Sequence, residues 1–207
     1  MYHIPHFKAH NENEVFEFMQ NHPFIILNGV DENNKPVATH IPVLLEKRGE
    51  TIFIKAHIMR NQTHTKAFEK NNNVLAIFSG AHAYVSAQHY TQQNTASTWN
   101  YSAVHASGKI NFLGDDELMK ILTELTEKFE QNKESPSLLQ HMGEEYIQSM
   151  LKAIVAFEIE VEHIDHVFKF SQNKDEVTRK KIIDSLENSN DFSQKQLALE
   201  MQKHFKD

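Results

Sequence analysis

Residues 97–113 read STWNYSAVHASGKINFL, and this stretch decides the fold class of the chain. It is rich in aromatic and β-branched residues, which are enriched in strands, and its one glycine is Gly108. We therefore expect one long strand over 97–113, with a kink near Gly108.

Further strands are predicted on both sides of this stretch. Apolar runs and alternating patterns place them at 24–30, 37–44, 51–57, 73–79, 83–86 and 153–170. In the last of these, Val155 and Phe157 alternate with Glu158 and Glu160, so one face is expected to be buried and the other wet. Short strands at this spacing favour a small, mostly antiparallel barrel over βαβ units.

Helices are predicted around these strands. After the acidic residues 115–117, which suit a helix N-terminus, Leu118, Ile121, Leu122, Leu125 and Phe129 fall on one apolar face. The predicted helices cover 11–20, 63–70, 115–129, 143–151, 175–186 and 193–205. The expected fold class is therefore α+β, mostly β with appended helices.

Composition excludes several classes of protein. The chain has 207 residues, a net charge of −7 with neutral histidines, no cysteine and six widely separated glycines. Without cysteine there is no disulfide, thiolate metal site or cysteine nucleophile. Without clustered glycines there is neither a G-x-G-x-x-G fingerprint nor a Walker A loop, so Rossmann and P-loop nucleotide enzymes are excluded.

Charge and hydropathy indicate where the chain acts. No apolar run approaches about 18 residues, so we expect no membrane span. The first residues, Met1 to Pro5, lack the basic and apolar regions of a signal peptide, and we expect a cytoplasmic protein. The negative charge disfavours broad binding to nucleic acid or anionic membranes, although a local basic patch can still bind.

Fourteen histidines raise the hypothesis of a metal site. His3, His6 and His10 are close in sequence but separated by a proline, and His163 and His166 lie on a predicted strand or its exit. No H-E-x-x-H motif is present. We therefore expect no metal site, with histidines that are exposed or hydrogen-bonded.

Three polar-aromatic segments could carry binding chemistry, and they cover residues 38–42, 55–61 and 98–105. Taken singly, each has a structural alternative. Arg60 lies beside a predicted helix start, where a guanidinium and free backbone N–H groups favour a phosphate; the alternative is a surface arginine. Trp99 and Tyr101 could form the wall of a site for a flat ring; the alternative is that both are core aromatics.

Seven segments, in order along the chain, resemble the PaiB family, also described as FMN-binding negative transcriptional regulators. They are Met1-Tyr2 with Pro5 and Phe7, Pro23-Phe24, Ala38-Thr39-His40-Ile41-Pro42, His57-Ile58-Met59-Arg60, Ala83-Tyr84-Val85-Ser86, Thr98-Trp99-Asn100-Tyr101 with Val104-His105 and Gly108, and Phe168-Lys169-Phe170-Ser171-Gln172-Asn173. The resemblance runs from residue 1 to about residue 187. The T-W-N-Y-x-x-V-H and K-x-S-Q-N segments are its most specific parts.

The resemblance implies an FMN-binding split barrel, the architecture of pyridoxamine-phosphate-oxidase-like flavoproteins. It implies a homodimer with FMN at the subunit interface, with the flavin phosphate near His57, Arg60 and Asn61. Thr39 and His40 are then expected on the neighbouring strand. The remaining implied site residues, which approach the ring or complete the dimer, are Trp99, Asn100, Tyr101 and His105.

The sequence departs from the family pattern beside the implied phosphate site. After the arginine the family often continues A-N-P-x-W, whereas residues 61–65 read NQTHT. The usual S-x-x-W-Y corresponds to residues 86–90, where His89 replaces the tryptophan. Lys66, on the next helical turn, is a candidate for the phosphate charge that the altered loop lacks.

The sequence leaves three functions open. The first is a flavin-binding sensor or regulator. The second is an FMN-dependent oxidoreductase, for which Tyr101 and His105 are candidate catalytic residues by position alone. The third is a DNA-binding repressor that uses cations of the last two helices, although acidic residues lie between them. These cations are Lys174, Arg179, Lys180, Lys181, Lys195, Lys203, His204 and Lys206.

The expected organisation is a split-barrel domain over 1–172, with helices inserted at about 115–151. A helical extension over 173–207 is expected to pack on the barrel.

Overall fold

In the computed structural model, residues 1–205 are described, and they form two compact units. The terminal unit contains Met1–Glu17, Ser79–Val104 and the chain from Asp165 onward. The central unit contains Phe18–Phe78 and His105–Ile164. We describe each unit by itself.

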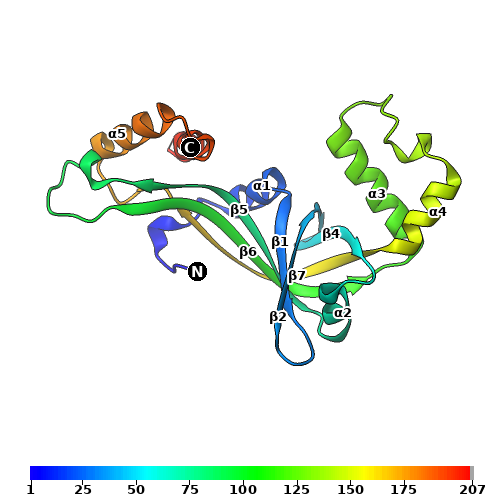
Figure 1. The fold of residues 1–207 in the computed structure, drawn as a ribbon. Coiled ribbons are helices and arrows are strands. Elements are labelled where there is room, and N and C mark those ends of the chain that lie inside the picture. Colours follow the sequence, from blue (N-terminus) through cyan, green and yellow to red (C-terminus); the bar gives the residue numbers. More distant parts are fainter. Residues whose placement is uncertain (206–207) are drawn as a thin grey trace. The chain divides into compact units, whose positions relative to one another are not determined.

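Seven strands form one sheet in the order β2-β1-β5-β6-β7-β4-β3. Their bounds are β1 Phe24–Val30, β2 Pro36–Pro42, β3 Leu44–Arg48, β4 Thr51–Met59, β5 Asn73–Val85, β6 Thr98–Phe112 and β7 Ile154–Lys169. The helices are α1 Glu12–Asn21, α2 Thr63–Lys70, α3 Asp115–Glu130, α4 Glu144–Ala153, α5 Glu176–Glu187 and α6 Phe192–His204 (Figure 1). The expected α+β fold class, mostly β with appended helices, is confirmed.

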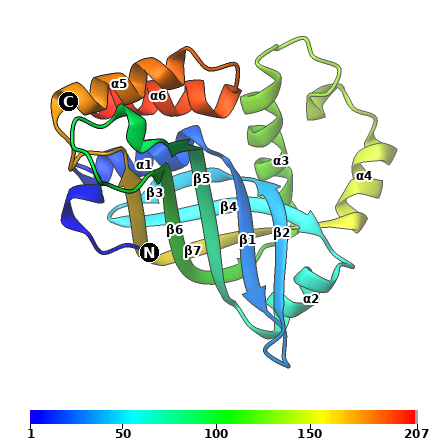
Figure 2. The ribbon, with the colours of Figure 1, turned by 60° about the vertical axis from the view of Figure 1, so that its left-hand side comes forward.

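In the central unit, two antiparallel hairpins supply the outer strands. β1 pairs with β2 from Phe24↔Pro42 to Val30↔Pro36, and the turn between them is closed by Asp31, whose carboxylate accepts from the N–H groups of Asn33 and Lys35. β4 pairs with β3 on one side and with β7 on the other (Figure 2). These pairings leave the end of β4 leading directly into α2.

Helix α3 covers part of the central sheet. Leu118, Ile121, Leu122 and Leu125 are buried on one face and pack in a cluster with Ala156 of β7. The apolar face predicted for this helix is thus correct for four positions, whereas Phe129 at its end is exposed. Helix α4 follows α3 in the chain, and none of its residues is buried.

The predicted break between strands at 73–79 and 83–86 is wrong, because β5 is continuous from Asn73 to Val85. The predicted break contains Gly80, which weakens the strand pattern in a sequence. At the predicted break, the N–H groups of Ala81 and His82 donate to the side chains of Glu200 and Ser193 of α6, so the strand is held there by contacts distant in sequence.

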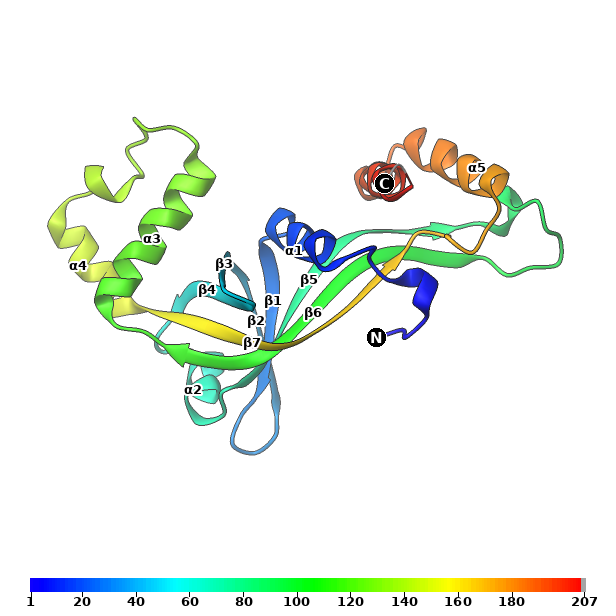
Figure 3. The same ribbon diagram turned by 180° about the vertical axis from the view of Figure 1, so that it is seen from behind.

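The terminal unit is built on helices α5 and α6, which lie side by side (Figure 2). Leu197, Ala198 and Met201 of α6 have no exposed surface. At the start of α5, Asp175 accepts from the Thr178 N–H, and the Thr178 hydroxyl accepts from the N–H of Thr91 in the β5–β6 connection (Figure 3). These contacts tie α5 to the end of that hairpin. Among residues 1–205, no helix is long and apolar enough to cross a bilayer.

Candidate functional site

The β4–α2 connection in the central unit carries the first set of predicted site residues. The hydroxyl of Thr65, which is fully buried, donates to the carbonyl of Met59 at 2.7 Å and closes the loop between strand and helix. The Arg60 N–H donates to the carbonyl of Ala153 at 2.9 Å. These two bonds hold Arg60 and Asn61 at the beginning of α2.

The guanidinium of Arg60 lies at the surface of this loop. It donates to the carboxylate of Asp115 at 3.2 Å and to the carbonyl of Leu151 at 3.3 Å. The Asp115 side chain is 65% exposed, and exposed pairs of this kind contribute about 0–1 kcal/mol. Arg60 is thus a surface arginine in this structure. Its ion pair with Asp115 is weak enough for an anion to replace the carboxylate.

The start of α2 offers further positive groups to an anion. Its N-cap is Gln62, and no side chain caps the helix. The first N–H groups of a helix have no partner within the helix, and they carry the positive end of its dipole. Lys66 is exposed in the first turn of the helix, and Asn61 is exposed before it. Arg60, Asn61, Lys66 and the uncapped helix start are thus contiguous within residues 60–66.

His57, at the end of β4, contains a buried polar atom without a partner. Its Nδ1 has no hydrogen bond among the described residues. Burial lowers the pKa of His57, so the imidazole is neutral at pH 7. A buried donor or acceptor without a partner costs about 1–3 kcal/mol, which makes this atom a candidate contact for a ligand.

The resemblance predicts Thr39 and His40 on the strand next to β4, but their strand is not hydrogen-bonded to β4. Their strand, β2, pairs with β1, and the sheet order places β2 and β4 far apart. Nevertheless β2 and β4 approach within 8 Å between Cα atoms, as do β2 and α2. Thr39 is half-buried and His40 is exposed, while His105 of β6 is half-buried.

The terminal unit carries the other predicted set, Trp99, Asn100 and Tyr101 of β6. Trp99 is 53% exposed and Tyr101 half-buried, so Trp99 is not a core aromatic. Asn100 points the other way and is fully buried. Its amide donates to the Ser171 hydroxyl at 2.9 Å and to the Met201 sulfur at 3.7 Å, and it accepts from Ser171 at 3.1 Å. The hydrogen-bonding groups of Asn100 are therefore engaged within the unit.

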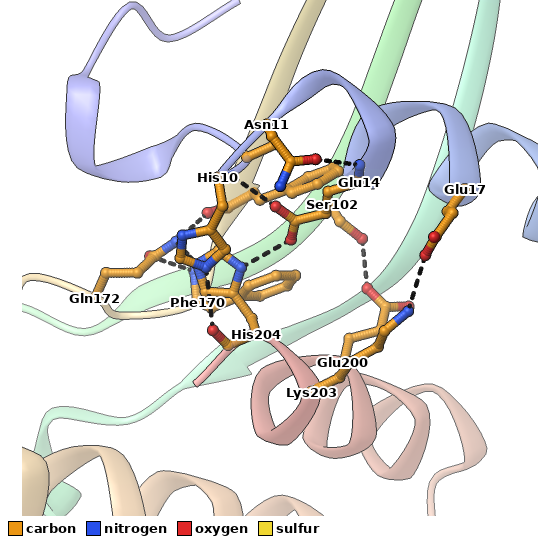
Figure 4. Close-up of polar contacts among 12 residues, drawn as sticks. His10, Asn11, Glu14, Glu17, Ser102, Phe170, Gln172, Glu200, Lys203 and His204 are labelled. Carbon is orange, nitrogen blue, oxygen red and sulfur yellow. Dashed lines mark hydrogen bonds and ion pairs between the residues drawn. The ribbon is translucent and has the colours of Figure 1, made fainter. Parts of the chain in front are cut away.

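A polar cluster that sequence spacing did not indicate joins the start of α1 to the end of α6 (Figure 4). Glu14 accepts from the His10 N–H at 2.6 Å and lies 3.0 Å from Nδ1 of buried His204, and the rings of His10 and His204 stack at 4.3 Å. Their candidate ligand atoms lie within 4.8 Å of one another, which makes a metal site conceivable.

Gln172 contacts the second ring nitrogen of His204 in this cluster. Its amide oxygen accepts from the Phe170 N–H at 2.8 Å and its amide nitrogen lies 3.3 Å from Nε2 of His204. In that orientation Nε2 of His204 accepts from Gln172 and its Nδ1 donates to Glu14. The geometry is that of a hydrogen-bonded junction between helices.

The cations predicted for DNA binding are partly engaged in contacts within the terminal unit. The Arg179 guanidinium lies 4.5 Å from the centre of the Phe205 ring, and Lys174 lies 4.3 Å from that of Tyr90. Lys203 pairs with Glu17 at 3.5 Å. Lys206, the last of the predicted cations, lies outside the described residues; among the others, these contacts leave fewer free cations than the sequence suggests.

Comparison with known proteins gives the family. Residues 1–163 match the family described as "Putative FMN-binding domain". The chain is 36% identical over 198 residues to "Protease synthase and sporulation protein PAI 2" of Bacillus subtilis (strain 168), covering 96% of this chain and 95% of that protein.

Solved structures agree on the fold. The FAD and heme binding protein from Mycobacterium smegmatis matches with a TM-score of 0.56 and 15% identity, over 78% of this chain and 72% of that one. A conserved hypothetical protein, Rv2991, from Mycobacterium tuberculosis matches with a TM-score of 0.55 and 9% identity, over 84% and 92%. At these identities the likeness concerns the fold alone. The family match and the Bacillus subtilis relative cover most of the chain, and they show that it belongs to the PaiB-like family of FMN-binding-domain proteins.

Proposed function

We propose that this protein binds FMN and acts as a flavin-dependent sensor or regulator. The observation that carries the proposal is the cluster of positive groups at the β4–α2 connection, in a chain whose family is described as FMN-binding. In this proposal Arg60, Asn61, Lys66 and the first N–H groups of α2 hold the flavin phosphate.

The residues present fit a phosphate monoester. Phosphate prefers a guanidinium, an ammonium and helix N-terminal N–H groups, and all three occur here within two turns of chain. The Arg60–Asp115 pair is exposed, so a dianion can replace that carboxylate at small cost. Neutral His57, with its buried Nδ1 open, is a further contact. Thr39 and His40 are included in the proposed site because β2 lies close to both β4 and α2.

When bound, a flavin supplies hydride and electron transfer, which the side chains cannot perform themselves. The protein's part is to hold the phosphate and to orient the cofactor. An FMN-dependent oxidoreductase remains the alternative, and measuring NAD(P)H consumption with FMN present separates it from a sensor. The family resemblance assigns Trp99, Asn100, Tyr101 and His105 to the ring or to a subunit interface, and these roles stay predictions.

The regulatory part of the proposal rests on the name of the Bacillus subtilis relative, a protease synthase and sporulation protein. We also propose a homodimer, because open sheet edges such as β2 and β3 require covering. Light scattering at micromolar concentration is expected to give twice the chain mass, and a monomer would refute the dimer. Operator binding by α5 and α6 ranks below flavin binding, and a salt-dependent shift assay on the protein's own promoter tests it.

The deciding experiment compares FMN with riboflavin, which has the same ring but no phosphate. We expect FMN to bind with a shifted visible spectrum, and we expect Arg60→Ala to weaken FMN binding roughly 10- to 100-fold, the value of a charged hydrogen bond. Riboflavin binding should not change in this variant.

Lys66→Ala and Lys70→Ala provide a matched pair on the same helix. Lys66 lies in the first turn of α2 and Lys70 in its last, so only Lys66→Ala is expected to weaken FMN binding. If FMN does not bind at high micromolar concentration, or if both lysine variants behave alike, the proposed phosphate site is wrong.

A further inference from the structure

The terminal unit has an open cavity on the outward side of β5 and β6. Its volume is about 320 Å³, and it is lined by Ser79, Gly80, His82, Trp99, Tyr101, Ser102 and Ala103. Small residues line part of it, and aromatic rings stand beside them. Trp99 is the single tryptophan of the chain.

The indole of Trp99 is held in place by its neighbours while half of its surface stays open. The His82 ring lies 6.0 Å from it between centroids, and the Tyr84 ring lies 6.2 Å away, edge-on. Both neighbours come from β5, the strand next to β6. An exposed tryptophan fixed on a rigid sheet presents an electron-rich face without further ordering.

Trp99 and Tyr101 both line the cavity. They are two residues apart on one strand, so their side chains share a face and stand about 6.6 Å apart at their Cα atoms. One guest at this cavity can therefore meet both rings.

The charge around the cavity favours a cation. Among the described residues, its lining contains no lysine or arginine. Glu200 of α6 accepts from the Ser102 hydroxyl at 2.5 Å and from the Ala81 N–H at 3.1 Å, and Ser102 shares the face of Asn100 rather than that of Trp99. The whole chain carries a net charge of −7, which attracts cations to its surface.

We propose that this cavity binds an organic ammonium ion, with its alkylated nitrogen against the faces of Trp99 and Tyr101. Ammonium groups are attracted to aromatic faces, most strongly to tryptophan, and quaternary ammonium ligands are recognised in this way. The cavity lacks the positive groups that an anion such as the FMN phosphate needs, so this site does not depend on the proposed flavin phosphate site.

Trp99 itself reports the binding. We expect choline to shift or quench the indole emission with a saturable curve, measured at constant ionic strength. Its uncharged isostere, 3,3-dimethyl-1-butanol, has the same shape and should give at least a roughly fivefold weaker response, because it lacks the cation–π attraction. Equal responses to choline and to the isostere would overturn the proposal.

Variants separate this cavity from the rest of the surface. Tyr101→Leu keeps an apolar side chain on β6, and we expect it to weaken choline binding roughly 2- to 30-fold, the range for one cation–π contact. Tyr146→Leu, on an exposed tyrosine of α4 in the central unit, is the matched control and should have no effect. Trp99→Phe removes the fluorescent side chain, so choline binding to that variant is measured by calorimetry instead.

Titration with FMN distinguishes this proposal from a ring-binding role for the same residues. If choline changes the Trp99 emission and saturating FMN leaves the affinity for choline unchanged, the ammonium site is supported whatever the outcome at Arg60. If FMN competes with choline, or if choline leaves the emission unchanged, the ammonium proposal is wrong.

Discussion

Gly108 marks the closest approach between two strands of the central unit, and its replacement by alanine tests the β6–β7 packing. A Cβ at this position would lie 2.0 Å from the carbonyl oxygen of Glu160 and 3.0 Å from the Cα of Val161. To reach an ordinary contact of 3.4 Å, the strands must separate by about 1.4 Å at this point. The obstructing atoms belong to the backbone, so no rotamer change relieves the clash.

The cost of Gly108→Ala follows from that separation. Overpacking of this kind costs about 1–3 kcal/mol, and each ladder hydrogen bond weakened by the displacement adds about 1 kcal/mol. We expect the free energy of unfolding to fall by about 3 kcal/mol or more, and Tm by roughly 10 °C for a chain of this size. Urea denaturation followed by far-UV circular dichroism measures the first quantity.

Gly114→Ala is the control for this prediction. Gly114 is the N-cap of α3, and an added Cβ there meets nothing within 4 Å. Alanine is a poorer N-cap than glycine, so a loss below about 1 kcal/mol is expected. If Gly108→Ala costs no more than Gly114→Ala, the close approach of β6 to Glu160 is not as the structure describes.

Three further predictions concern buried and charged polar groups. Asn100→Leu removes the amide that satisfies the buried hydroxyl of Ser171, and denaturation should show a loss of about 1–3 kcal/mol. The hydroxyl of Thr91 and the helix N–H groups lower the pKa of Asp175 from 3.8 to about 2, so its contribution to stability is present above pH 4 and lost as the pH falls toward 2. Unfolding followed against pH should show a weaker dependence in Thr91→Val, because the Thr178 contacts remain, and an unchanged profile would contradict the role of Thr91. Thr65→Val, which loosens the β4–α2 loop, should cost about 1 kcal/mol and weaken FMN more than riboflavin; equal effects on both ligands would remove its positioning role.

Local pattern was enough to predict most elements of the fold. Alternation over 153–170 and the apolar face after residue 115 appear in the structure as β7 and α3. The pattern failed where Gly80 interrupted it, because side chains of α6, far away in the sequence, accept from the N–H groups that follow the glycine. It also did not indicate that β2 and β4 approach each other without being paired in the sheet.

The candidate sites were only partly predictable. The β4–α2 connection was indicated by Arg60 beside a helix start, because strand end and helix start are contiguous in sequence. Sequence did not indicate that Arg60 pairs with Asp115, 55 positions away, nor that Asn100 turns inward while Trp99 faces outward. The direction of a side chain on a strand depends on what covers each face of the sheet.

The sequence by itself determined the strand and helix segments, the lack of glycine-rich phosphate loops, and the family to which the chain belongs. Only the tertiary structure decided which groups meet: the junction of His10, Glu14 and His204 spans nearly the whole chain, and the cavity beside Trp99 needs two adjacent strands. The physical reason is that periodicity encodes burial over a few neighbouring residues. Contacts between distant residues depend on packing that no local spacing describes.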